Sequence, residues 1–137
     1  MLLESPSMES PMHKTAPLFV LALALPLAAW SQTKAPSLPI GQGRPVIAGI
    51  TRTTLKDDAK STVTRVHFKP GAAEPAHTHP YDVIIVPLIA ATIEFTIGDR
   101  TVTAVKPGDV QFVPRDVTHQ LTNAGQQDFE LIAVALK

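Results

Sequence analysis

Three histidines have the residue type and the spacing to bind one metal ion. His77 and His79 are two residues apart, so in an extended segment both imidazoles project from the same face. A third imidazole, that of His119, would complete a facial set of nitrogens if it came from a neighbouring strand. A single histidine is more often a surface or hydrogen-bonded core residue. Three of them among turns marked by glycine and proline favour a metal site.

The composition limits which ion such a site can bind and which partners the chain can have. The 137 residues contain no cysteine, which excludes disulfides, a thiol nucleophile and thiolate metal ligands. Three neutral imidazoles, with or without one carboxylate, suit a divalent transition ion better than Ca²⁺ or Mg²⁺. With so few protein ligands, positions stay open for water, O₂ or a chelating small molecule. The balance of 12 basic and 12 acidic residues, without a basic stripe, argues against a nucleic-acid partner.

We expect a single domain of short strands to position these histidines. The 13 prolines favour short strands joined by turns, and no stretch after residue 32 has a helical period. We predict a linker at residues 32–45 and one all-β domain at residues 46–137, an antiparallel sandwich or barrel. The predicted strands cover residues 46–55, 61–68, 83–86, 92–97, 100–105, 110–113, 119–121 and 129–136.

The N-terminus has the pattern of an export signal at residues 1–31. An apolar run from Leu18 to Trp30 is shorter than the roughly 20 residues that span a bilayer. Small residues at Ala29 and Ser31 predict cleavage before Gln32, and Met12 is an alternative start. The alternative is an uncleaved membrane anchor. We expect an exported, periplasmic protein with no membrane contact after cleavage.

Two motifs in the chain resemble those of the cupin family. The second cupin motif reads G-x5-P-x-G-x2-H-x3-N, and this chain matches every fixed position except the second glycine, which is Asp116. Aspartate tolerates left-handed backbone conformations better than most residues, so the turn can survive the change. The matching residues are Gly108, Pro114, His119 and Asn123 in the second motif, and Gly71, His77 and His79 in the first half of the first motif.

The resemblance implies an antiparallel jelly-roll β-barrel, the cupin fold, with a metal inside its mouth. His77, His79 and His119 would then hold an ion of iron, manganese, nickel, zinc, cobalt or copper. Cupins serve as dioxygenases, isomerases, decarboxylases and non-enzymatic binding proteins, so the fold by itself does not identify a reaction.

The first motif departs from the family pattern after its second histidine. The family glutamate is missing, because Val83 and Ile84 occupy its place, and Asp82 comes one residue too early. In a regular strand that odd offset turns Asp82 to the opposite face, unless Pro80 interrupts the strand. Asp82 is therefore either a fourth ligand or a residue that is solvated or bonded to a backbone N–H. Without it, a divalent ion would favour an anionic oxygen ligand such as an enolate, phenolate or carboxylate. The glycine that closes the motif is also missing.

Three functions stay open at this point. The chain could be a metal-dependent dioxygenase or isomerase acting on a small oxygen-rich molecule, a non-enzymatic module that binds a small ligand or a metal, or a barrel with purely structural histidines. Tyr81 and Gln111 are candidate substrate-binding residues, and Tyr81 could equally pack at the rim. Glu74 is either an acid–base candidate or a solvated turn residue. The strands at residues 46–55 and 129–136 could pair across a two-fold axis in a homodimer.

Overall fold

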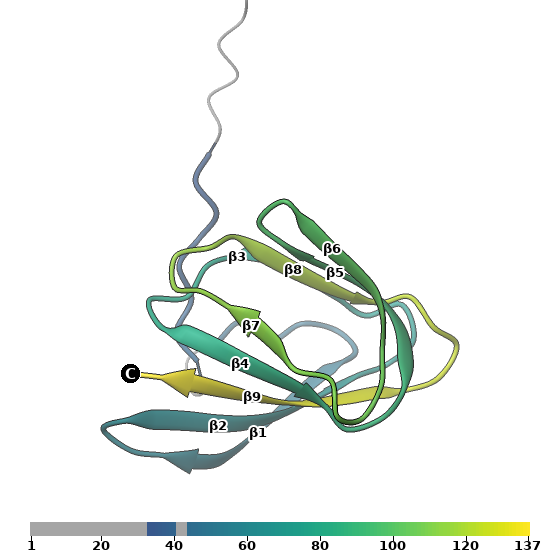
Figure 1. Ribbon diagram of the computed structural model, residues 1–137, viewed down its shortest axis with the longest axis horizontal. Helices are drawn as coiled ribbons and strands as arrows, with labels where there is room; N and C mark the ends of the chain where they lie inside the picture. Colours follow the sequence, from purple (N-terminus) through teal and green to yellow (C-terminus); the bar gives the residue numbers. More distant parts are fainter. Residues whose placement is uncertain (1–32, 41–43) are drawn as a thin grey trace, which may run out of the picture. The chain divides into compact units, whose positions relative to one another are not determined.

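The computed structural model describes residues 33–40 and 44–137, and within these ranges it contains nine strands (Figure 1). The predicted signal segment lies outside the described residues. Within the described ranges, no helix has the length and apolar character needed to cross a membrane. The strands are β1 (Ile50–Asp57), β2 (Ser61–Phe68), β3 (Ala73–His77), β4 (Asp82–Pro87), β5 (Ala91–Ile97), β6 (Arg100–Val105), β7 (Gln111–Val113), β8 (His119–Asn123) and β9 (Phe129–Leu136).

The strands form two antiparallel sheets that face each other as two layers (Figure 1). One sheet has the order β1-β2-β9-β4-β7 and the other has the order β3-β8-β5-β6. Buried and exposed positions alternate along β2 and β5, as expected for strands with one face on the core. The prediction of an all-β antiparallel fold is confirmed. β2, β6 and β9 also have the predicted bounds.

The core between the sheets is aromatic and aliphatic. Phe68, Phe95 and Phe129 are each 1% exposed, and the ring centroids of Phe68 and Phe129 are 6.0 Å apart. Burial of such a side chain contributes about 1.5–3 kcal/mol. The core therefore fixes how the two sheets face each other, and the histidines lie at one end of it.

The first strand starts later than predicted, at Ile50 instead of Val46. Gly49 has φ +77° and lies in a turn, and a left-handed residue of this kind interrupts an extended strand. Val46, before this turn, is 98% exposed. The β-branched residues before Gly49 therefore led the prediction to start the strand four residues too early.

Residues 33–40, which we call the arm, pair with the segment that follows β3. The backbone N–H of Thr78 donates to the carbonyl of Pro36 over 2.8 Å, and that of Leu38 donates to the carbonyl of Thr78 over 2.8 Å. Ser37 and Thr78 form a parallel β-bridge. Part of the predicted linker therefore contacts the residue that lies between His77 and His79.

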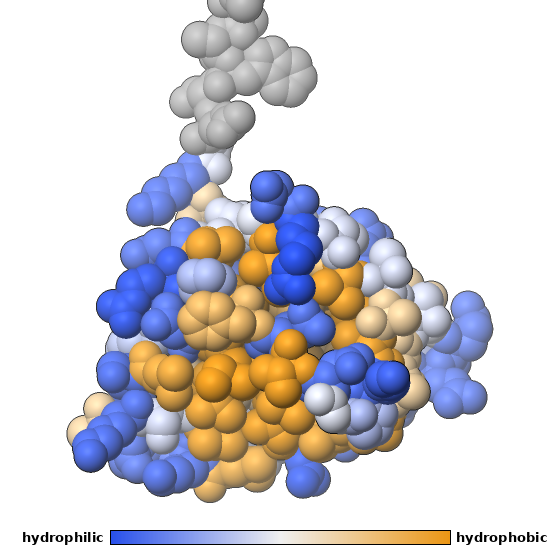
Figure 2. All heavy atoms as spheres, in the orientation of Figure 1, coloured by the Kyte–Doolittle hydropathy of each residue, from blue (hydrophilic) through white to orange (hydrophobic). Residues whose placement is uncertain are grey.

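Apolar side chains also remain on the outside of the larger sheet. In Figure 2 they gather over the region of β4, β7 and β9. Phe112 is 49% exposed and Leu136 is 40% exposed. Exposed apolar surface of this kind is common at contacts between proteins. The homodimer stays a prediction.

Asp116 takes the conformation that the family's glycine would take. Its φ is 60°, and it is the only non-glycine residue with positive φ in the described part of the chain. Its backbone N–H donates to the carbonyl of His79 over 2.8 Å. The turn that precedes β8 is thereby tied to the segment that carries His79.

Replacing Asp116 tests this turn directly. A β-branched residue in the left-handed region is strained, so we expect Asp116→Val to lower the free energy of unfolding by about 1–2 kcal/mol. Asp116→Gly relieves that strain and should change the free energy by less than about 1 kcal/mol. Urea unfolding of the three proteins measures both effects. Equal effects of valine and glycine would contradict the assignment.

Candidate metal centre

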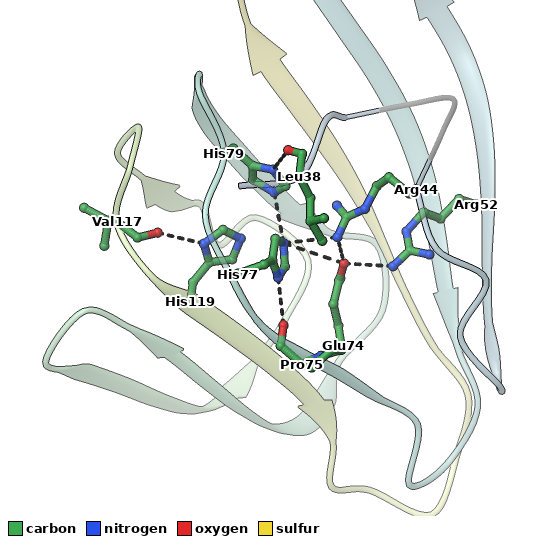
Figure 3. A network of polar contacts seen from close by, with 9 residues as sticks. All are labelled: Leu38, Arg44, Arg52, Glu74, Pro75, His77, His79, Val117 and His119. Atoms are coloured by element: carbon green, nitrogen blue, oxygen red, sulfur yellow. Dashed lines mark hydrogen bonds and ion pairs between the residues drawn. The ribbon is translucent and has the colours of Figure 1, made fainter. Parts of the chain in front are cut away.

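The strand register brings the three histidines together at one end of the barrel (Figure 3). His77 on β3 and His119 on β8 are direct partners in the antiparallel pairing, so their side chains project from the same face of the sheet. His79 follows β3 two residues later. The side-chain atoms available as ligands all lie within 4.8 Å of one another. The three residues are 2%, 4% and 5% exposed, so the group is closed off from bulk water.

Each of the three imidazoles is oriented by a backbone carbonyl. The Nδ1 atoms of His77, His79 and His119 donate to the carbonyls of Pro75, Leu38 and Val117 over 2.8, 2.8 and 3.0 Å. A carbonyl only accepts hydrogen bonds, so the proton of each neutral ring is on Nδ1 and the lone pair is on Nε2. This is the orientation that backbone carbonyls impose on metal-binding histidines.

Burial keeps these rings neutral. It lowers the pKa of His77 to about 3 and that of His79 to about 4, and it also lowers the pKa of His119. The hydrogen bonds to the backbone carbonyls raise each pKa, but by less than burial lowers it. The positive charge of Arg44 lowers all three further. At neutral pH all three rings are therefore neutral and each Nε2 carries a lone pair that can bind a cation, although that of His77 also lies 3.1 Å from the Nη2 of Arg44.

These shifts predict how the stability of the metal-free protein depends on pH. In the unfolded chain the histidines titrate near pH 6.5, whereas in the folded chain His77 and His79 titrate at about 3 and 4. Between these values the unfolded state binds more protons. The free energy of unfolding should therefore fall as the pH drops from about 6.5 to about 4, by up to about 1.4 kcal/mol per pH unit for each proton taken up.

Urea unfolding at pH 7, 6 and 5, followed by circular dichroism, measures this slope. A His77→Gln variant should show a smaller slope, because one of the contributing rings is gone. His67→Gln is the control, because His67 lies on β2 with its side chain 28% exposed and paired to Asp128. The same slope in His77→Gln as in the unmodified protein would contradict the prediction.

Two arginines and a glutamate extend the site on the other side of His77 (Figure 3). The Glu74 carboxylate forms ion pairs with Arg44 and, over 2.8 Å, with Arg52. Its Oε1 lies 3.7 Å from the Nε2 of His77, and the Nη2 of Arg44 lies 3.1 Å from the same nitrogen. Glu74 is thus a buried residue of the site and not a solvated turn residue.

The sequence contained only weak signals for these three residues. The pairing register of β3 with β8 shifts between Glu74 and His77, and this bulge puts residues three apart on the same face. Pro75 inside the strand was the available sign of it. Arg52 is two residues after buried Ile50 in β1, so both side chains project from the same face of the strand. Arg44, in the predicted linker, had no periodic signal.

The remaining predicted site residues lie elsewhere. Asp82 Oδ1 accepts a hydrogen bond of 2.8 Å from the backbone N–H of Arg115, and its Oδ2 lies 3.6 Å from the guanidinium of that residue. Its carboxylate has the backbone partner that was the alternative to ligation, and it is outside the histidine group. Gln111 accepts a hydrogen bond of 3.0 Å from Arg100. Neither Gln111 nor Tyr81 lines the cavity at the histidines.

That cavity has a volume of about 40 Å³. The three histidines, the two arginines and Glu74 form its polar side, and apolar side chains of both sheets form the rest. One water needs roughly 10–15 Å³ by this measure, so the cavity holds only a few non-hydrogen atoms. Any ligand bound there is small and largely shielded from solvent.

The donor set fits a divalent transition ion. The Nε2 atoms of His77 and His79 face each other at 3.1 Å, although both carry lone pairs, since the Nδ1 atoms carry the protons. Two such acceptors repel unless a cation lies near both. Three neutral imidazole nitrogens without thiolate are the ligands of borderline divalent ions. His77, His79 and His119 are the residues that would hold the ion.

Comparison with known proteins agrees with this fold. The family model described as "Cupin domain" matches residues 64–135, more than half of the chain. No curated protein sequence matches the chain. Among solved structures, a cupin domain from Bordetella pertussis is similar to it, with 26% identity, a TM-score of 0.58, and coverage of 71% of this chain and 99% of that one.

Two similar structures carry enzyme names. A predicted oxalate decarboxylase from Thermotoga maritima is 24% identical, with a TM-score of 0.56 and coverage of 64% of this chain and 79% of that one. A polyketide cyclase from Streptomyces resistomycificus is 22% identical, with a TM-score of 0.58 and coverage of 76% and 70%. At these identities the likeness shows the fold, a jelly-roll barrel.

Proposed function

Because this chain belongs to the cupin family, we propose that it binds one divalent transition ion through His77, His79 and His119, and a small oxygen-rich molecule at that ion. The observation that supports this most strongly is the common orientation of the three rings. Each Nδ1 donates to a backbone carbonyl, and the ligand atoms of all three lie within 4.8 Å of one another. Rings held this way bind an ion without the entropy cost of ordering three side chains.

The residues of the chain determine what such a site can do. A bound ion supplies a Lewis acid or an O₂-binding site. The histidines contribute no charge, so the doubly positive ion is not neutralised by its ligands and the site favours an anionic oxygen ligand. The apolar cavity wall excludes water, which strengthens these electrostatic interactions. An enzyme of the dioxygenase or isomerase type is the first candidate.

A binding module without chemistry is the second candidate, and one observation favours it. Glu74 is the only carboxylate that lines the cavity in the described part of the chain, and both arginines already pair with it. A carboxylate held in two ion pairs is a poor proton acceptor, because the positive charges stabilise its ionised form. The site thus has no free carboxylate base among the described residues.

Elemental analysis of protein purified without a metal-binding tag tests the proposal. We expect close to one transition ion per chain in the unmodified protein and in His67→Ala, and almost none in the His77→Ala, His119→Ala double variant. His67 is a suitable control because it is a histidine of the same fold that pairs with Asp128 and is not part of the histidine cluster. An empty unmodified protein, or equal loss in the control, would reject metal binding.

An oxygen-electrode assay then separates a dioxygenase from a binding module. The metal-loaded protein is offered phenolic, diketone and sugar-acid candidates. Oxygen consumption that disappears in the double variant supports a dioxygenase. Ligand binding without turnover supports the binding module.

A further inference from the structure

Arg44 and Arg52 are buried in the cavity with more positive charge than their partner can neutralise. Their side chains are 9% and 12% exposed. Both pair with the same atom, Oε1 of Glu74. Two guanidinium groups and one carboxylate leave one positive charge in excess inside a largely apolar cavity. Burying an uncompensated charge is costly. An anion bound in the cavity would neutralise this charge and is therefore favoured.

The same arginines retain hydrogen-bond donors with no protein partner. The Nε atoms of Arg44 and Arg52 are buried and unpaired, and so is the hydroxyl of Thr64. Thr64 is 2% exposed and lines the same cavity. Buried polar groups of native proteins are nearly always hydrogen-bonded. Three unpaired groups around one cavity therefore indicate that a ligand supplies the missing acceptors.

The strand register explains why the donors reach the cavity. Arg52 on β1 is the direct partner of Val66 on β2, and Val66 is buried in the core. Partners across a strand pair project from the same face, so Arg52 points inward, as does Thr64, two residues before Val66. Arg44 enters from the segment before β1, and its guanidinium reaches His77.

The arginine side and the histidine side of the cavity meet at His77 (Figure 3). The Nη2 of Arg44 lies 3.1 Å from the Nε2 of that histidine. One small ligand can therefore contact both sides at once, with an oxygen toward the histidines and an anionic group toward the arginines.

We propose that Arg44 and Arg52, oriented by Glu74, select a short-chain carboxylate as the molecule that this site binds. A planar guanidinium donates two parallel hydrogen bonds to the two oxygens of a carboxylate, and the Nε donors are the ones left unpaired here. The small cavity, about 40 Å³, favours a compact acid over a long-chain one. The inference rests on the proposed function, because it names the ligand class of that same site.

Calorimetric titration of pyruvate and of its neutral amide, pyruvamide, tests the inference. The two probes have the same shape and differ in charge. We expect pyruvate to bind at least tenfold more tightly, since a charge-assisted hydrogen bond is worth a factor of about 10–100. We expect Arg52→Gln to remove most of that difference and Arg52→Lys to retain part of it. Arg65→Gln is the matched control, because Arg65 lies exposed on β2.

The titrations are done on metal-loaded protein and on protein stripped with a chelator, with the metal content of each variant measured. Pyruvate selectivity that depends on Arg52 while the metal content is unchanged supports the inference. The inference is overturned if the two probes bind equally or if neither binds. It is also overturned if inorganic phosphate, titrated in the same way, binds more tightly than pyruvate, or if Arg52→Gln has no effect. If the unmodified protein takes up no metal, the proposed function fails, and the stripped protein still tests the arginines.

Discussion

Replacing Glu74 with glutamine will lower the free energy of unfolding by about 3–5 kcal/mol, the range found when one partner of a buried ion pair is removed. Glutamine keeps the size of the side chain and removes its charge. The guanidinium groups of Arg44 and Arg52 would then be buried close together without a counter-charge. Urea unfolding followed by circular dichroism measures the loss. Fluorescence is unsuitable, because the only tryptophan, Trp30, precedes the predicted cleavage site.

Two further variants separate this effect from a general sensitivity to mutation. Glu94→Gln makes the same change at an exposed position on β5, where we expect less than about 0.5 kcal/mol. The triple variant Arg44→Met, Arg52→Met, Glu74→Leu should recover most of the stability, since apolar side chains can replace a buried ionic network. If Glu74→Gln lowers the free energy of unfolding as little as Glu94→Gln does, Glu74 does not neutralise the buried charges of the two arginines.

Binding of a transition ion will raise the free energy of unfolding of the stripped protein by about 4 kcal/mol at an ion concentration a thousand times the dissociation constant. The reason is that only the folded chain brings the imidazoles of His77, His79 and His119 together. Thermal unfolding across a Zn²⁺ titration measures the effect. A further rise of about 1.4 kcal/mol should accompany each tenfold increase in ion concentration.

Removing one ring should largely abolish this stabilisation. His79→Ala leaves two imidazoles, whereas His67→Ala leaves the cluster intact and should behave like the unmodified protein. A Zn²⁺-dependent rise that persists unchanged in His79→Ala would mean that the ion binds elsewhere. Loss of the rise in His67→Ala would lead to the same conclusion.

The strands and the histidine cluster could be predicted because their signals are local. Residues that favour β-structure mark β2, a long apolar run marks β9, and turns with proline and glycine separate the strands. The spacing of His77 and His79 put both rings on one face, and a motif resemblance placed His119. The positive φ of Asp116 followed from the steric tolerance of aspartate.

The charged half of the cavity could not be predicted, because its residues meet only in three dimensions. Arg44 and Glu74 are 30 residues apart in sequence, and neither has a motif. Glu74 faces the cavity because of the bulge before His77, and a regular strand would have turned it outward. Arg52 alternates with buried Ile50, but arginine at such a position is usually read as exposed.

The contact between the arm and His79 makes the centre dependent on a segment outside the nine strands. The carbonyl of Leu38 accepts the Nδ1 proton of His79 over 2.8 Å, and the same segment pairs with Thr78 through its backbone. Attachment of the arm and occupancy by an ion are then thermodynamically linked, and each must strengthen the other by the same factor. Amide hydrogen exchange at Thr78 should accordingly slow when the ion binds, which makes that single N–H a reporter of occupancy.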